Sequence, residues 1–150
     1  MPQVGDPAPD FELLDQAGDP IRLSNFRGQR VVLYFYPRAD TPGCTKEACG
    51  FRDDYHFYDA RSVVILGVSP DTVEDQAKFA AKHSLPFPLL ADKDHKVGES
   101  YGAWGLKKSF GREYMGMKRM TFLIDEEGTV SKVYRTVKPT EHSRQLLAVL

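Results

Sequence analysis

The stretch that decides the fold is residues 30–49, "RVVLYFYPRADTPGCTKEAC", where an apolar run leads through a turn to both cysteines of the chain. Residues 30–36 are almost entirely β-branched, aromatic or aliphatic, a pattern that predicts a strand buried on both faces. Pro37 cannot donate a backbone hydrogen bond, so it should end this strand. From Thr45 to Ala60 apolar residues recur at helical spacing, which predicts a helix over 45–60; these residues are Ala48, Phe51, Tyr55 and Tyr58.

A second buried strand, "SVVILGVSP" at residues 62–70, follows the predicted helix. Two such strands joined by a helix form a parallel βαβ unit, whose crossover is right-handed. Strands and helices alternate along the rest of the chain, which predicts an α/β fold with a central mixed sheet flanked by helices. The expected elements are an N-terminal hairpin with Gly18 in its turn, a helix over 73–84 capped by Asp71 or Thr72, a strand over 87–92, a short helix within 95–104, a hairpin over 120–136 that turns at 126–128, and an amphipathic helix over 140–150.

The length and the net charge of the chain limit the kinds of partner and function that we expect. The 150 residues suit one domain, expected to span 1–150. The chain has 20 basic and 21 acidic residues and a formal charge of -1, so neither nucleic acid nor an anionic membrane is expected as a partner. No apolar run is long enough to span a bilayer, and the first residues lack the pattern of a signal peptide. We therefore expect a cytoplasmic protein, in which paired cysteines indicate redox or metal chemistry rather than a permanent disulfide.

Cys44 and Cys49 allow several interpretations. On residue type alone, each could be a small buried apolar side chain, Cys49 more readily than Cys44. Cys44, however, follows a strand-ending loop and begins the predicted helix, whose free N–H groups and dipole stabilise a thiolate. A thioredoxin-type dithiol has two residues between its cysteines, and here there are four. In an intact helix this spacing separates the Cα atoms by roughly 8 to 9 Å, too far for an unstrained disulfide.

A zinc site is a further alternative. Zinc in proteins usually takes four ligands in a tetrahedral arrangement, and the two cysteines could supply half of them. The four histidines are scattered along the chain, and no pair shows the spacing of ligands on a helix; they are His56, His83, His95 and His142. We expect each to be a solvated surface residue, and we expect no bound metal.

The segment "FYPRADTPGCTKEAC" resembles the active-site stretch of the peroxiredoxins, and within them that of the Q-type group, also called bacterioferritin comigratory protein. Pro37, Thr41 and Cys44 match the spacing of the family's Pro, Thr and peroxidatic Cys, and Cys49 matches the resolving Cys of many Q-type members. "YMGMKRMTFLID" is similar to the segment that carries the family's Arg, which places that residue at Arg119. The resemblance spans nearly the whole chain; one departure is Met120, where many relatives carry Ser or Thr.

The resemblance implies a thioredoxin-like fold and a thiol-dependent peroxidase. Cys44 would attack the peroxide and become a sulfenic acid, and Cys49 would resolve it as an intrachain disulfide. Thioredoxin or a glutaredoxin-like protein would then reduce the disulfide. Arg119 would bind thiolate and peroxide, Thr41 would orient one of them, and Pro37 would shield the site. The Q-type members also imply a monomer, because the disulfide lies within one chain.

Two further expectations concern the surroundings of the site. Tyr34 and Tyr36 share a strand face and are expected either in the core or in the lining of a pocket, whereas an apolar pocket around Phe35, Trp104 and Phe110 would accept alkyl groups. No Gly-rich phosphate loop is present, so we expect no bound cofactor. The alternative function is a redox-switched binding or holdase module that reacts with peroxide once and does not turn over.

Overall fold

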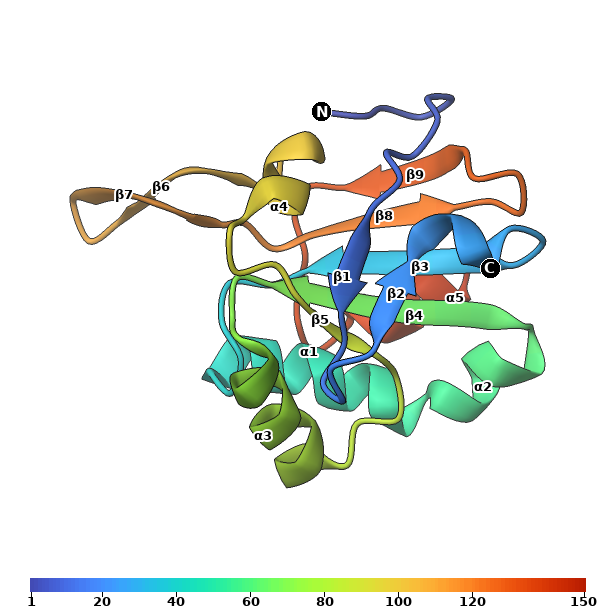
Figure 1. Ribbon diagram of the computed structural model, residues 1–150, viewed down its shortest axis with the longest axis horizontal. Helices are drawn as coiled ribbons and strands as arrows, with labels where there is room; N and C mark the ends of the chain where they lie inside the picture. The colour runs from blue at the N-terminus through green and yellow to red at the C-terminus, as the bar shows by residue number, and fades with distance from the viewer.

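The centre of the computed structural model, which describes residues 1–150, is the pair of parallel strands that the apolar runs predict (Figure 1). β3 (Arg30–Phe35) pairs with β4 (Val63–Ser69) along its whole length. Every residue of β3 after Arg30 is buried, because both faces of the strand are covered. The prediction of a parallel pair joined by a cysteine-bearing helix is therefore confirmed.

The remaining strands complete a mixed seven-stranded sheet in the order β2-β1-β5-β4-β3-β8-β9. β1 (Glu12–Leu14) and β2 (Pro20–Arg22) form the predicted N-terminal hairpin, and β5 (Leu89–Ala91) runs parallel to β4. β8 (Met120–Ile124) lies antiparallel to β3, and β9 (Val130–Tyr134) pairs with β8. The predicted turn at 126–128 joins these last two strands, so the prediction of a mixed sheet is confirmed.

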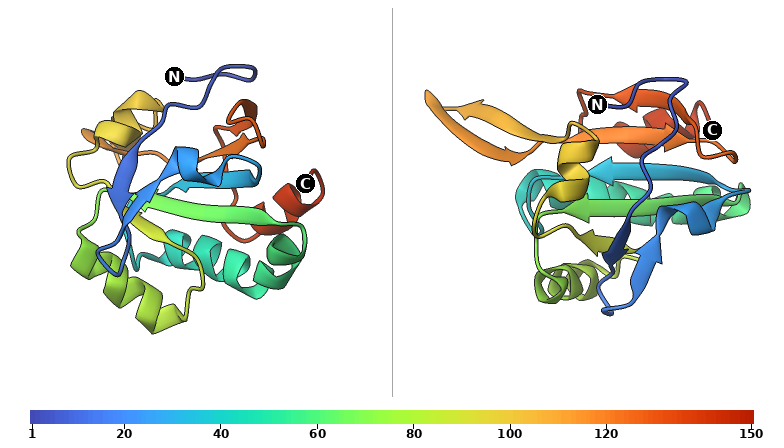
Figure 2. Two further views of the ribbon diagram at one scale, coloured as in Figure 1. Left: turned by 45° about the vertical axis from the view of Figure 1, so that its right-hand side comes forward. Right: turned by 45° about the horizontal axis from the view of Figure 1, so that its top comes forward.

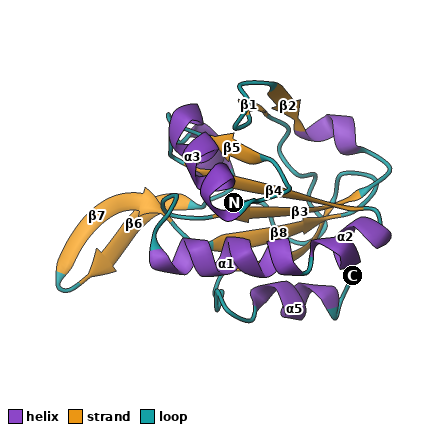
Figure 3. Cartoon of the chain, turned by 90° about the horizontal axis from the view of Figure 1, so that it is seen from below, coloured by secondary structure: helices purple, strands orange, loops and turns teal.

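Helices cover both faces of the sheet and enclose two hydrophobic cores (Figures 1 and 3). One face packs against α1 (Pro42–Asp53), α2 (Tyr55–Ala60), α3 (Val73–His83) and α5 (His142–Leu147). The other face packs against the N-terminal segment, the 3-10 helix η1 (Leu23–Phe26) and α4 (Lys96–Ser100). Tyr34 and Tyr36 lie fully buried in the first core with their rings stacked 5.4 Å apart, which confirms their expected place. No helix is long and apolar enough to cross a membrane.

The helix predicted over 45–60 is wrong in both its start and its continuity. α1 begins at Pro42, which occupies the first helical turn, where its missing N–H costs nothing. The helix then ends at Asp53, and α2 follows after Asp54 as a separate short helix. The Asp54 carboxylate accepts a hydrogen bond from Ser143 Oγ at 2.8 Å and pairs with Arg144 at 2.8 Å. These contacts connect Asp54, the residue between the two helices, to the start of α5.

The segment 104–117, for which the sequence pattern predicts no helix or strand, is a two-stranded ribbon. β6 (Trp104–Ser109) and β7 (Arg112–Met117) pair only with each other and project from the body (Figure 2). The turn between them is Phe110–Gly111, with φ of 51° and 75°. Both values lie in the left-handed region, as a two-residue turn of this hand requires. Phe110 therefore stands at the tip of the ribbon, completely exposed, rather than in a pocket.

Candidate active site

Cys44 lies in the first turn of α1 with only 1% of its surface exposed. The first backbone hydrogen bond of this helix runs from the Thr45 N–H to the Thr41 carbonyl at 2.8 Å. The N–H groups of Gly43 and Cys44 precede that bond, so they have no helical carbonyl to bind. They are donors at the positive end of a helix dipole, beside the thiol.

Arg119, the residue just before β8, contacts two side chains of α1 at once. Its Nη2 donates to Cys44 Sγ at 3.3 Å, and its Nη1 donates to Glu47 Oε1 at 2.7 Å. The Arg119 side chain is 19% exposed. Burial alone would lower the pKa of Arg119, but the negative charges of Cys44 and Glu47 outweigh it and raise that pKa. The structure thus brings Arg119 to Cys44, where its guanidinium is paired with both Cys44 and Glu47.

Glu47 is a site residue that the sequence reasoning missed. Its side chain has no exposed surface, and its Oε2 has no hydrogen-bond partner. Burial raises the pKa of Glu47 to about 7, although the Arg119 charge opposes this. Its position three residues after Cys44 on a helix is the signal that could have found it, because such residues lie on one face. The Tyr34 hydroxyl is likewise buried without a partner, and burial, together with nearby negative charges, raises the pKa of Tyr34 well above its usual value.

Close packing against the Arg119 guanidinium explains why residue 43 is a glycine. A Cβ at this position would lie 3.0 Å from Arg119 Nη2, closer than side chains normally approach. The same Cβ would lie 3.8 Å from Pro139 Cγ, so the loop before α5 borders the site as well. Glycine therefore lets the helix start and the guanidinium come together, with Pro139 as a neighbour that the sequence does not reveal.

The loop between β3 and α1 is tied to the neighbouring strand. Ala39 N–H donates to Asp71 Oδ2 at 2.7 Å, and the same oxygen accepts from Ser69 Oγ at 2.6 Å. Gln76 extends this buried network by donating to Ser69 Oγ at 2.7 Å and accepting from the Tyr36 hydroxyl. Asp71 therefore anchors the loop, and the cap of α3 is Thr72, whose hydroxyl accepts from the Asp75 N–H at 3.1 Å.

Pro37 and Thr41 stand at the two ends of this loop. Pro37 follows β3 and is partly buried, and Thr41 is the N-cap residue of α1. The Thr41 hydroxyl donates to the Arg38 carbonyl at 2.8 Å, so its proton is already engaged in a hydrogen bond. Its oxygen lone pairs remain available to accept another hydrogen bond.

Both cysteines are free thiols on the same helix. Cys49 lies five residues after Cys44 within α1 and is partly exposed, whereas Cys44 is buried. The helix holds the two Cα atoms at the roughly 8 to 9 Å expected for this spacing. A bond between the two sulfurs therefore requires the helix to open.

The four histidines differ in how far they are buried. His142 is completely buried, which corrects the expectation that all four are surface residues. Its Nε2 lies 2.7 Å from Thr121 Oγ1 and its Nδ1 lies 3.1 Å from Gln145 Oε1. Both ring nitrogens thus have partners, and α5 can turn the ring inward against the sheet. No group of three or more His, Cys, Asp or Glu side chains is placed to hold a metal ion.

The expected apolar pocket around Phe35, Trp104 and Phe110 is absent. Phe35 is fully buried in the core between the sheet and α4, and Phe110 is at the exposed tip of the ribbon. Trp104 instead stacks on His95, with 3.9 Å between ring centroids and 4° between planes. The three side chains cannot form one binding surface because the ribbon carries Phe110 away from the body.

Comparisons with known proteins agree over the length of the chain. The model of the AhpC/TSA family matches residues 4–133. "Peroxiredoxin Bcp" of Bacillus subtilis is 49% identical over 148 residues, which cover 99% of this chain and 94% of that protein. The crystal structure of peroxidoxin BcpB from Mycobacterium tuberculosis superposes with a TM-score of 0.87 at 40% identity, covering 99% of this chain and 96% of the other. A structure of the Xanthomonas campestris bacterioferritin comigratory protein, described for its alkyl peroxide reduction activity, gives a TM-score of 0.88 at 34% identity, covering 93% and 88% of the two chains.

Proposed function

This chain belongs to the AhpC/TSA family, and from that premise we propose that it is a Q-type peroxiredoxin that reduces hydrogen peroxide and organic hydroperoxides. The observation that carries the proposal is the contact of Arg119 with the Cys44 sulfur at the N-terminus of α1. A guanidinium and free helical N–H groups around one buried sulfur are what a thiolate nucleophile requires. The thioredoxin-like fold shared with the structural relatives supports the same conclusion.

In the first step the Cys44 thiolate attacks one oxygen of the peroxide. An S–O bond forms as the O–O bond breaks, so the peroxide is reduced by two electrons and Cys44 becomes a sulfenic acid. The other oxygen takes up a proton and leaves as water or an alcohol. Negative charge moves from sulfur to that oxygen, and Arg119 with the N–H groups of Gly43 and Cys44 can stabilise it in both places.

Thr41 and Pro37 have supporting roles in this proposal. Because the Thr41 hydroxyl gives its proton to the Arg38 carbonyl, its oxygen is free to accept the O–H of the peroxide. That contact would orient the peroxide for attack. Pro37 would fix the start of the loop and limit the access of water to the sulfur.

In the second step Cys49 attacks the Cys44 sulfenic acid. An S–S bond forms, and the sulfenic oxygen leaves as water together with the proton of the Cys49 thiol. A dithiol protein of the thioredoxin or glutaredoxin type then reduces this disulfide by thiol exchange. The disulfide forms within one chain, and on that ground we propose a monomer of one domain that works in a reducing, cytoplasmic compartment.

The test is peroxide-dependent NADPH oxidation in the presence of thioredoxin and its reductase, with hydrogen peroxide and an alkyl hydroperoxide as substrates. Wild-type protein should turn over many times, and Cys44→Ser should not, because a serine hydroxyl is not ionised near neutral pH. Consumption of a single equivalent of peroxide by wild-type protein with every reductant would support the redox-switched module instead. Substantial turnover by Cys44→Ser would overturn the assignment of the nucleophile.

A further inference from the structure

The β6–β7 ribbon has no part in the chemistry proposed above, yet it carries a cluster of exposed apolar side chains. Four large ones lie on it: Leu106 is 53% exposed, Phe110 103%, Tyr114 46% and Met115 55%. Figure 2 shows the ribbon standing away from the sheet, and its strands pair only with each other. Isolated exposed apolar residues are common, but a cluster on a projecting element marks an interaction surface.

The pairing register places Leu106 and Met115 on one face of the ribbon and Tyr114, which pairs with Lys107, on the other. Directly paired residues of an antiparallel ribbon share a face, so Leu106 and Met115 lie side by side. The pair below them on this face is Trp104 and Met117, and Met117 is buried in the core. These four side chains form an apolar strip that begins inside the molecule at Met117 and ends at the exposed Leu106 and Met115; the next pair on this face, Lys108 and Glu113, forms an ion pair at 3.4 Å.

The ribbon is basic, whereas the rest of the chain is acidic. Residues 104–118 contain four Lys or Arg residues and one Glu, a formal charge of +3. The whole chain carries -1, so the remaining residues carry -4. Gly105 and Gly116 pair on the face of the ribbon opposite Leu106, and two of these lysine side chains pack over them. A Cβ on Gly116 would lie 3.1 Å from Lys107 Cδ, and a Cβ on Gly105 would lie 3.3 Å from Lys118 Nζ.

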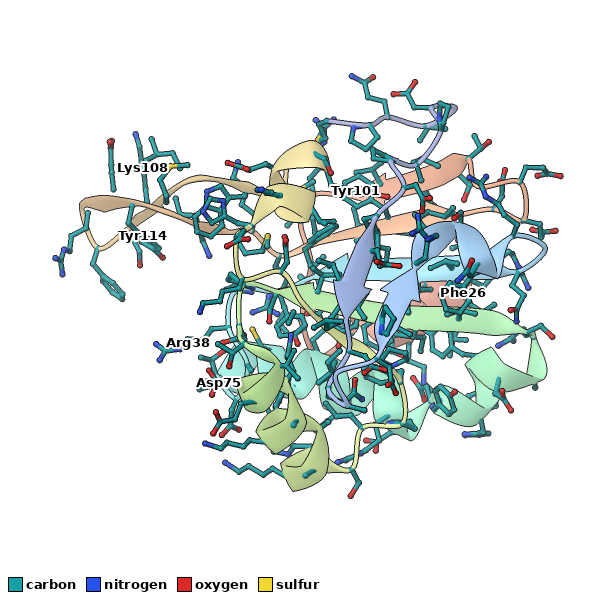
Figure 4. The ribbon with its side chains drawn as sticks, in the orientation of Figure 1. Phe26, Arg38, Asp75, Tyr101, Lys108 and Tyr114 are labelled. Carbon is teal, nitrogen blue, oxygen red and sulfur yellow. The ribbon has the colours of Figure 1, made fainter.

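The base of the ribbon adjoins the reactive sulfur. Lys118 ends the segment, and the next residue is Arg119, which binds Cys44. Figure 4 shows Lys108 and Tyr114 on the ribbon, on the same side of the molecule as Arg38, which lies in the loop before α1. The base of the ribbon is therefore adjacent to the sulfur at which the disulfide forms, and the ribbon projects on the side of the molecule that holds the loop before α1.

We propose that the β6–β7 ribbon is the docking surface for the protein that reduces the Cys44–Cys49 disulfide. The occupant is a dithiol protein whose thiol-bearing face is apolar and rimmed by acidic side chains, complementary to the strip and to the charge of +3. A second copy of the ribbon would not fit, because two surfaces of the same charge repel each other. The inference rests on the proposed function and adds the surface through which the cycle is completed.

The experiment separates the two halves of the cycle. The apolar variant is Leu106→Ser/Met115→Ser and the charge variant is Lys108→Glu/Arg112→Glu. The matched controls are Val149→Ser, which is 50% exposed in the parent, and Arg61→Glu, exposed at the end of α2 on the opposite side of the molecule (Figure 1). For each protein we would measure the rate constant with peroxide, turnover with dithiothreitol, and the KM for thioredoxin in the NADPH-coupled assay.

Both ribbon variants should raise the KM for thioredoxin by about fivefold or more, the size expected for the loss of part of an interface. The rate constant with peroxide and the turnover with dithiothreitol should stay as in wild type, as should every parameter of the controls. The charge variant should also weaken the dependence of the thioredoxin reaction on ionic strength. A third variant removes the outer part of the ribbon by replacing residues 106–115 with a two-residue turn between Gly105 and Gly116. It should show the same rise in the KM for thioredoxin.

Unchanged KM values for thioredoxin in all three variants would overturn the proposal. A change of oligomeric state in the variants, measured by light scattering, would also overturn it by showing an interface between copies. Wild-type protein that turns over with dithiothreitol but with neither thioredoxin nor a glutaredoxin would reject the docking surface and leave the peroxidase standing. Wild-type protein without turnover with any reductant would reject the peroxidase itself.

Discussion

The buried Glu47 should make the stability of the folded protein depend on pH in a way that Glu47→Gln abolishes. Burial raises the pKa of Glu47 from an ordinary 4.5 to about 7 in the folded protein. A carboxyl with a raised pKa holds its proton more tightly when folded, so its stabilising contribution is complete below about pH 4.5 and is lost as the pH rises through about 7. At about 1.4 kcal/mol for each pH unit between these values, the loss amounts to about 3 kcal/mol.

The measurement is urea unfolding between about pH 4.5 and pH 8 of Cys44→Ser and of Cys44→Ser/Glu47→Gln. The Cys44→Ser background removes the titration of the thiol. As the pH rises across this range, the free energy of unfolding of the double variant should increase by up to about 3 kcal/mol relative to that of its parent. This change is expected whatever the difference in stability between the two proteins at low pH. The exposed Glu126→Gln in the same background is the control. A difference between parent and double variant that does not change with pH would refute the reasoning.

Three further predictions concern the cycle. Arg119→Lys should slow the reaction with peroxide about tenfold or more, since one misplaced charged hydrogen bond is worth roughly 1.5 kcal/mol; stopped-flow rates equal to wild type would leave Arg119 without a catalytic role. Cys49→Ser should consume one equivalent of peroxide and accumulate a dimedone-reactive sulfenic acid at Cys44, and rapid turnover with thioredoxin would show that Cys49 is dispensable. Oxidation to the disulfide should accelerate amide hydrogen exchange within residues 43–55 alone, because the helix must open for the sulfurs to meet; equal protection in both redox states, with the disulfide confirmed by mass, would contradict this.

The sheet could be predicted because its signals are local. The runs at 30–36 and 62–70 contain enough β-branched and aromatic residues to identify buried strands, and Pro37 marks where the first one ends. The break of the long helix at Asp54 could not be predicted in this way. It depends on Ser143 and Arg144, nearly ninety residues away, which bind the Asp54 carboxylate.

The ribbon and part of the site escaped prediction for different reasons. Phe110–Gly111 is a possible two-residue turn, but the flanking strands are mostly exposed or only partly buried and mix charged with apolar residues, so they lack the alternation of a half-buried pair. Glu47 looks like a surface residue because its burial depends on Arg119, a partner that only the tertiary structure supplies. Arg119 itself could be identified only through the resemblance to the peroxiredoxins.

The two anchors on either side of α1 have a kinetic consequence. Asp71 holds the chain at Ala39, and α5 holds it at Asp54. If α1 unwinds on oxidation, the freed segment is a tether of about fifteen residues with both ends already in place, so re-forming the helix costs little loop-closure entropy. Loops and helices of this length close in about a microsecond or less. Return to the reactive conformation after each reduction should therefore be far faster than any encounter with a reductant, and the enzyme should be ready for the next peroxide almost at once.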